Sequence, residues 1–345
     1  MLLSRRGLIG LPFAGLLRGG TYRLDARRAA VMRGVRFLTD VARNPVHFKD
    51  YATDLMFCFY GLAEATSNEE MKRVCWDVGR ERAAHWRAQV PVVPEQAGPV
   101  TISDLVYGCL SADGLGFPNA AMKEELARRA VGLSAVQFLG FDPLREGPPS
   151  DIPKKCKRCK KWSVRGSRQC FQCKGKLTMM SRYDVFFEAM LTAYFGERYG
   201  IRLGASFPEV MRWVPSLRPY VVPGGKLRGE FYSVAYTVTH IVYVSNDYDM
   251  RRLPRADFEA EFAFLAGNLR RCITGKDPET LGEFVDSLLV LGMEESDPLI
   301  REGMDYLLAH QNADGSWGDA RDKDMYNRYH TTWTGVGALM EYKWA

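Results

Sequence analysis

The sequence lacks the features of several protein classes. No stretch approaches the roughly 18 to 20 uninterrupted apolar residues of a membrane-spanning helix, which argues against an integral membrane protein. Low-complexity tracts are absent too, and strand signals are scarce. The chain has 345 residues, of which 46% are hydrophobic and 26% are charged. This balance is typical of a globular protein and excludes a disordered or collagen-like one.

Acidic residues are missing from one segment, residues 154–176. It contains ten Lys or Arg and no Asp or Glu, and therefore carries a charge of +10. The whole chain has a net charge of +6, which leaves about −4 for the remainder. Any electrostatic contact with nucleic acid or with an acidic partner protein is therefore expected in this basic segment.

Four of the eight cysteines lie in the basic segment. They form Cys156-x2-Cys159 and Cys170-x2-Cys173, with ten residues between the pairs. Two such pairs suit a closed tetrahedral zinc site with four thiolates, because each short turn points two sulfurs at one ion. We therefore predict a structural zinc knuckle, with iron in the same ligand set as the alternative.

The remaining cysteines and the first residues bear on the cellular compartment. Cysteines outside the two pairs occur singly in apolar or helical contexts, which favours a reducing compartment and a cytoplasmic protein. The alternative is export, since Ser4, Arg5 and Arg6 before a short apolar run resemble a twin-arginine signal. Pro12 and the absence of a small-x-small cleavage site weigh against export. We treat residues 1–25 as a separate N-terminal segment.

Nearly every long segment outside the basic region has apolar residues at helical spacing, as at Val31, Val35, Leu38 and Val41. The sequence therefore predicts an all-α protein of helical hairpins, interrupted by a zinc-binding insertion. The predicted parts are residues 26–149 (first helical part), 150–178 (insertion) and 179–345 (second helical part). The predicted helices are 29–42, 49–65, 68–89, 101–112, 120–139, 181–199, 207–217, 230–246, 255–274, 279–291, 298–311 and 329–342.

A local signature near the C-terminus supports a more specific fold. The run from Tyr306 to Gly318 contains Gln311, then Asp314-Gly-Ser-Trp317-Gly, and it resembles the glutamine–tryptophan repeat of terpene cyclases and protein prenyltransferase β subunits. Downstream, Tyr329-His330-Thr331 resembles the Tyr-His-Thr helix of the prenyltransferases. The resemblance covers residues 297–342 and implies an α/α toroid, a barrel of helical hairpins. It also implies that His330 is a zinc ligand in the central cavity.

The chain also departs from this superfamily. It has no upstream Asp-x-Cys zinc pair, no Asp-Asp-x-x-Asp diphosphate motif and no complete Asp-x-Asp-Asp acid motif. The nearest acid segment, Asp247-Tyr248-Asp249-Met250, lacks the last acid. Prenyl transfer and squalene-type cyclisation are therefore not expected.

A second metal site is predicted in the cavity. His240 and Asp247 lie seven residues apart in an almost uncharged stretch, and seven residues of helix turn through about 700°, which places both on one face. Together with His330 they would bind Zn, Fe or Cu and leave coordination positions open. Tyr248, Asp249 and Tyr329 are the candidate proton-transfer groups. The alternative is a buried His240–Asp247 pair without metal.

Two functions remain open from the sequence. The first is a metal-dependent enzyme acting on a small or peptide-like apolar substrate, by Lewis-acid or oxygen-activating chemistry. The second is a non-catalytic scaffold whose basic zinc knuckle binds nucleic acid or a partner protein.

Overall fold

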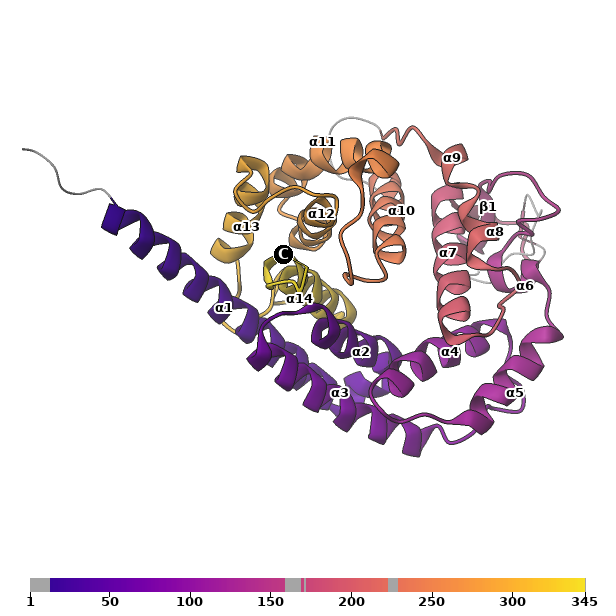
Figure 1. Ribbon diagram of the computed structural model, residues 1–345. Helices are drawn as coiled ribbons and strands as arrows, with labels where there is room; N and C mark the ends of the chain where they lie inside the picture. The colour runs from indigo at the N-terminus through magenta and orange to yellow at the C-terminus, as the bar shows by residue number, and fades with distance from the viewer. Residues whose placement is uncertain (1–12, 159–168, 171, 223–228, 345) are drawn as a thin grey trace, which may run out of the picture.

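The computed structural model describes residues 13–158, 169–170, 172–222 and 229–344. The described chain is predominantly α-helical, as predicted, with one small β-hairpin (Figure 1). The longer helices are α1 (Phe13–Arg43), α2 (Pro45–Ala65), α3 (Glu69–Gln89), α4 (Pro99–Gly114), α5 (Ala120–Val131), α7 (Arg182–Tyr199), α10 (Gly229–Ser245), α11 (Glu259–Gly275), α12 (Pro278–Val290), α13 (Pro298–Ala309) and α14 (Met325–Leu339). The short elements are α6 (Ala135–Leu139), α8 (Phe207–Met211), α9 (Val214–Leu217), a 3-10 turn (Arg255–Phe258), β1 (Ile152–Cys156) and β2 (Leu177–Met180).

Six helices contact one another in a closed circuit. In order along the chain these are α2, α4, α7, α10, α12 and α14, and α14 returns to contact α2. Helices α1, α3, α5, α11 and α13 pack against members of this circuit and lie at the periphery in Figure 1. The circuit brings the first and last parts of the chain together, because α1 also packs along α14.

Local sequence signals explain where many helices begin. Asp297 caps α13, with its side chain accepting the backbone N–H of Leu299, and Pro298 follows in the first turn, as predicted. Helix α3 is capped by Asn68, whose side chain accepts the backbone N–H of Met71. Helix α4 begins at Pro99 and not near Thr101, since proline suits a first helical turn.

The glutamine–tryptophan segment fastens α13 and α14 to α1. Trp317 is fully buried and donates from Nε1 to the Leu307 carbonyl oxygen at 2.8 Å. Gln311 donates from Nε2 to the carbonyl oxygens of Ala30 and Gly315, both at 2.9 Å. In these contacts Gln311 satisfies free backbone groups, and Trp317 packs against neighbouring helices.

Two predicted helices are broken. Residues 120–139 form α5 and α6, because the chain turns after Val131 and Ser134 starts a new helix with a capping box. Residues 207–217 likewise divide into α8 and α9. Part of the predicted N-terminal segment is also helical from Phe13 onwards, whereas Arg5 and Arg6 lie outside the described residues.

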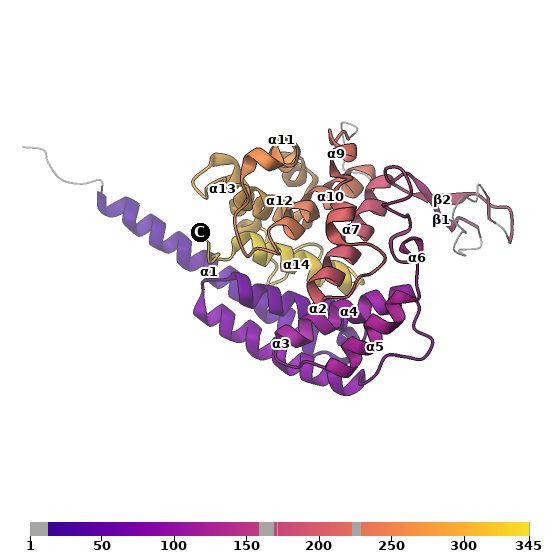
Figure 2. The same ribbon diagram turned by 45° about the vertical axis from the view of Figure 1, so that its right-hand side comes forward.

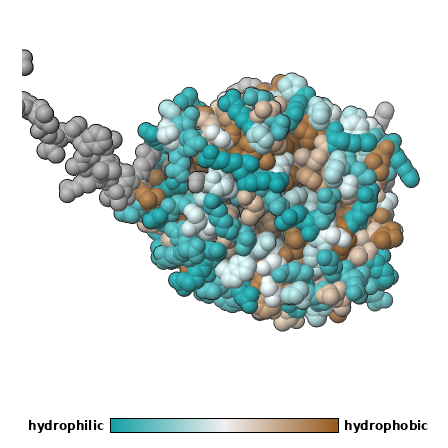
Figure 3. Space-filling model, viewed as in Figure 1, coloured by the Kyte–Doolittle hydropathy of each residue, from teal (hydrophilic) through white to brown (hydrophobic). Residues whose placement is uncertain are grey.

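A β-hairpin stands at the predicted insertion, and its second strand ends at Met180, two residues beyond the predicted boundary. Strands β1 and β2 pair antiparallel, with Ile152 opposite Met180 and Cys156 opposite Leu177. The hairpin projects from one side of the helical body (Figure 2). On the face shown in Figure 3, hydrophilic and hydrophobic residues are interspersed. Across the described part of the chain, we find no helix whose length and apolar character would let it cross a membrane.

Candidate functional site

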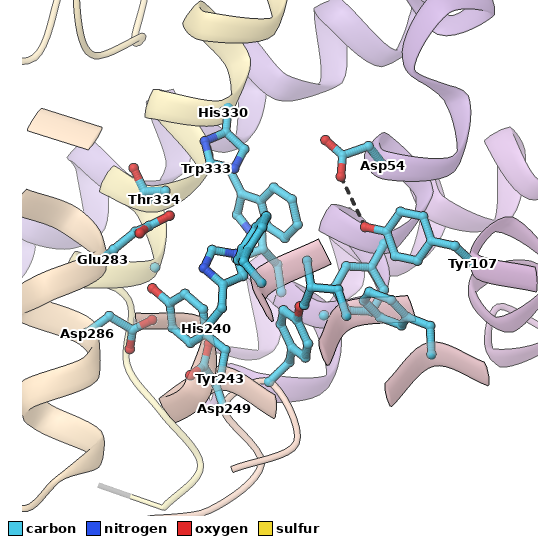
Figure 4. Close-up of a pocket in the computed structure, with 18 of the residues that line it drawn as sticks. Asp54, Tyr107, His240, Tyr243, Asp249, Glu283, Asp286, His330, Trp333 and Thr334 are labelled. Atoms are coloured by element: carbon cyan, nitrogen blue, oxygen red, sulfur yellow. Dashed lines mark hydrogen bonds between the residues drawn. The ribbon is translucent and has the colours of Figure 1, made fainter. Parts of the chain in front are cut away.

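A cavity of about 390 Å³ lies among the circuit helices. All six contribute to its wall, so residues far apart in the sequence face a common space (Figure 4). The lining has five carboxyl groups, two histidines, eight Phe, Tyr or Trp rings and few other polar groups. These are Asp54, Asp104, Asp249, Glu283 and Asp286; His240 and His330; and Phe57, Tyr107, Phe187, Phe195, Tyr243, Tyr248, Tyr326 and Trp333.

Helix α12 supplies two buried carboxyl groups. Glu283 and Asp286 are three residues apart, so they lie on the same helix face, and they are 1% and 4% exposed. Glu283 accepts a hydrogen bond from the Thr239 hydroxyl at 2.8 Å. Burial raises the pKa of Glu283 to about 8, and burial together with the charge of Asp249 raises the pKa of Asp286 well above its usual range. Glu283 is therefore suited to hold a proton at neutral pH.

His330 is held in its cationic form. Its Nδ1 lies 3.0 Å from Glu279 Oε1, and Glu279 also accepts from the hydroxyls of Tyr236 and Thr331. Burial alone would lower the pKa of His330, but the hydrogen bond and charge of Glu279 outweigh it. The hydrogen bond and charge of Glu279, together with the charges of Glu283 and Asp54, raise the pKa of His330 to about 9.

His240 has the opposite protonation state. Its Nδ1 lies 2.9 Å from the Tyr236 carbonyl oxygen, so Nδ1 carries the hydrogen and Nε2 is an acceptor. Burial and the charge of His330 lower the pKa of His240 to about 3. The cavity thus combines one neutral and one cationic imidazole, both predicted as site residues.

The predicted metal set is not assembled. Helix α10 ends at Ser245, and Asp247, Tyr248 and Asp249 have φ angles of 65°, 53° and 71°. This left-handed turn ends the helical register on which the prediction rested. Asp247 instead accepts from Tyr194 at 2.5 Å and pairs with Arg198 at 3.1 Å. Among the described residues, no group of three ligand atoms within 4.8 Å of one another includes His240, Asp247 or His330.

The predicted proton-transfer residues occupy two environments. Tyr248 and Asp249 line the cavity, and burial raises the pKa of Asp249 to about 6, although a hydrogen bond from Asn246 acts against this shift. Tyr329 is fully buried behind the wall and donates to Asp54 at 2.6 Å. Tyr107 donates to the other oxygen of Asp54 at 3.0 Å, so Tyr329 positions a cavity carboxylate and does not reach the cavity itself.

Three acidic residues of this region were not predicted from the sequence: Glu279, Glu283 and Asp286. A signal was present, because Glu283 and Asp286 interrupt the otherwise apolar run from Leu281 to Leu291. Charged residues in such a run are rarely buried without a functional reason.

The cysteine site is brought together in part. The sulfurs of Cys156, Cys170 and Cys173 all lie within 4.8 Å of one another, and they could hold a metal ion such as zinc. Cys156 also accepts the backbone N–H of Arg158 at 3.4 Å. A Cβ at Gly175 would lie 3.1 Å from the Cys156 sulfur and 3.2 Å from the Cys173 sulfur, so glycine keeps the turn compact. Cys159 lies outside the described residues.

Comparison with known proteins does not place the chain in a family. No protein-family model matches the chain, and no curated protein does. The resemblance to terpene cyclases and prenyltransferases therefore stays a hypothesis drawn from the residues themselves.

Proposed function

We propose that this chain is an acid–base enzyme whose active site is the cavity among the circuit helices. We further propose that the circuit is an α/α toroid, with α2, α4, α7, α10, α12 and α14 as its inner helices. The closed order of helix contacts and the glutamine–tryptophan segment support the toroid. The enzyme proposal rests on one observation. Carboxyl and imidazole groups whose pKa values are shifted in different directions share one aromatic-lined cavity.

Three groups have distinct roles in this proposal. Glu283, neutral at pH 7, donates a proton to the substrate, and Asp249 accepts one, because its pKa of about 6 leaves it mostly ionised. His330 stabilises negative charge that develops on the substrate, since Glu279 keeps it cationic. One proton removed and one returned amount to an isomerisation, an addition or an elimination on a small organic substrate.

A cavity metal fits the observed residues poorly. The nitrogens and oxygens of the predicted set do not converge, and Asp247 is engaged by Tyr194 and Arg198. A cationic His330 would also have to lose its proton before it could bind a metal. The proposed reaction therefore uses only side chains of the chain.

Hydrogen exchange with solvent tests this proposal. The full chain is incubated in D2O with a panel of small ketones and alkenes, and deuterium incorporation is measured by mass spectrometry. We expect incorporation with at least one compound class, a rate maximum between about pH 6 and 8, and a loss of at least 100-fold in Glu283→Gln. Glu124→Gln, an exposed glutamate on α5, is the matched control. Equal incorporation in both variants would contradict the proposal.

A second candidate function has support at the hairpin. The cysteine cluster lies on an element that projects from the helical body, and Lys157 and Arg158 beside it are exposed. This arrangement would suit docking of nucleic acid or an acidic partner protein. Binding of single-stranded nucleic acid that weakens with salt and is lost in Lys157→Glu/Arg158→Glu would support this function, and unchanged binding in that variant would contradict it.

A further inference from the structure

The cavity has an excess of acidic groups that the chain does not balance. Its lining includes no Lys or Arg, and its histidines are the neutral His240 and the already paired His330. The ion pairs formed by the described residues involve other carboxylates, such as Asp247 and Glu261. None places a nitrogen of Lys, Arg or His within 4.0 Å of the five cavity carboxyl groups. The cationic His330 is the positive group on the described cavity wall, and its hydrogen-bond partner is Glu279, so the five cavity carboxyl groups have no ion pair of their own.

Two of these groups are buried where a missing partner is costly. Glu283 and Asp286 are almost inaccessible to solvent, and ionised carboxylates in such surroundings need a cation or several hydrogen-bond donors. Glu283 receives one hydrogen bond, from the Thr239 hydroxyl, and Asp286 receives hydrogen bonds from the hydroxyls of Tyr342 and Tyr243. A positive charge bound in the cavity would stabilise the ionised forms.

Aromatic rings surround the same space. Phe57 is central among them, with its ring centroid 4.9 Å from that of Tyr248, 5.0 Å from Tyr107 and 6.1 Å from Trp333. The faces of such rings attract organic cations, whose apolar substituents also gain from leaving water. Carboxylates alone would suit many cations, but carboxylates within an aromatic wall favour an organic one.

A metal ion matches the cavity less well. A volume of about 390 Å³ is far larger than an ion and falls within the roughly 300 to 1,000 Å³ of small-molecule sites. The lining donors do not converge on one point. Aromatic walls provide no ligand atoms for Mg²⁺, Zn²⁺ or Ca²⁺.

We propose that the cavity binds a small organic cation, an ammonium compound whose charge lies against Glu283 and Asp286 and whose apolar part lies against Phe57, Tyr248 and Trp333. This inference rests on the proposed function, in that it names the substrate class of the same active site. A bound ammonium group would stabilise the carboxylate that Glu283 becomes once it has transferred its proton to the substrate.

A charged probe and its uncharged counterpart test the inference. Choline and 3,3-dimethyl-1-butanol have the same shape and hydroxyl group and differ in one nitrogen and its charge. Their binding to the full chain is measured by calorimetry at about pH 8, where Glu283 is partly ionised. We expect choline to bind at least tenfold more tightly than the alcohol.

Variants place the probe in the cavity. Glu283→Gln and Trp333→Leu should each weaken choline binding at least fivefold, whereas Glu124→Gln should leave it unchanged. Circular dichroism confirms that each variant is folded. Equal affinity for the two probes, no binding of either, or choline binding that survives Glu283→Gln together with Asp286→Asn would each overturn the inference. The deuterium-exchange experiment does not depend on these results, so a failed substrate class and a failed acid–base proposal can be told apart.

Discussion

At the scale of single residues, burial changes the pKa of Glu283 enough to make the stability of the chain depend on pH. Its folded pKa of about 8 lies above the value near 4.5 expected when the chain is unfolded. The stability linked to this group is therefore complete below about pH 4.5 and is lost as the pH rises through about 8. The buried ionised carboxylate should destabilise the folded chain above that pH.

We therefore predict that Glu283→Gln raises the free energy of unfolding at pH 8.5 by on the order of 3 kcal/mol and changes it little at pH 4.5. Glutamine keeps an oxygen that can accept the Thr239 hydrogen bond but cannot ionise. Urea denaturation at both pH values measures the effect. A gain of the same size in the exposed control Glu124→Gln would show that burial is not the cause.

A second prediction concerns the His330–Glu279 pair. Removing the Glu279 charge leaves burial as the main influence on His330, so Glu279→Gln should move the His330 pKa from about 9 to below 7. In the parent chain, the stability from this pair is complete below about pH 6.5 and lost as the pH rises through about 9. NMR titration of ¹⁵N-labelled histidine measures the change. A pKa that stays near 9 would mean that Glu279 does not control this imidazole.

Residue chemistry was predictable only in part. His240, His330, Tyr248 and Asp249 were expected in the site and line the cavity. Asp247 was misplaced, because a helical register can be extended in the sequence past the point where the backbone leaves the helix. Glu283 and Asp286 were missed, because acidic side chains on a helix usually face water and the sequence does not show that α12 is enclosed by α10, α11, α13 and α14.

At the scale of elements, close helix packing depends on Gly282. A Cβ at this position on α12 would lie 2.7 Å from the Thr334 carbonyl oxygen of α14, and backbone atoms cannot rotate away. We predict that Gly282→Ala destabilises the chain by about 1 to 3 kcal/mol. Gly267→Ala on α11 meets nothing within 4 Å and should stabilise by up to about 1 kcal/mol. Thermal unfolding of both variants measures the contrast, and equal shifts would argue against tight α12–α14 contact.

The hairpin differs from the helices in what holds it together. Its strands are short and contain Pro153 and lysines, so their sequence does not predict strands, and the cysteines are the stronger organising signal. This explains why the knuckle was predicted but its β-hairpin was not.

Zinc content should therefore depend on the hairpin alone. We predict about one zinc per chain, lost in Cys156→Ser with little change in helical circular dichroism, because the contacts that close the circuit are made between helices. Cys272→Ala, at a buried position on α11, should retain zinc. Elemental analysis measures both, and zinc retained in Cys156→Ser would contradict the assignment.

At the scale of the whole molecule, Arg27 joins α1 to the end of α14, and so holds an early and a late part of the chain together. Its guanidinium donates to the carbonyl oxygens of Leu339 and Met340 at the end of α14 and pairs with Glu295 at 2.7 Å. Arg28 beside it makes only an exposed pair with Glu341. Arg27→Met should cost about 2 to 4 kcal/mol, because the α14 carbonyls lose their donors, and Arg28→Met less than about 1 kcal/mol. Denaturation curves of the two variants measure both losses of stability, and equal losses would contradict this role of Arg27.

The closed circuit also bears on how the chain is made. Helix α14 supplies His330 and Trp333, and it contacts α1, α2 and α12. During synthesis, the earlier helices leave the ribosome while their partner surface on α14 has not yet been translated. The cavity therefore cannot form until α14 has been synthesised, so a chain truncated before α14 would expose apolar helix faces to chaperones and proteases and would lack this cavity.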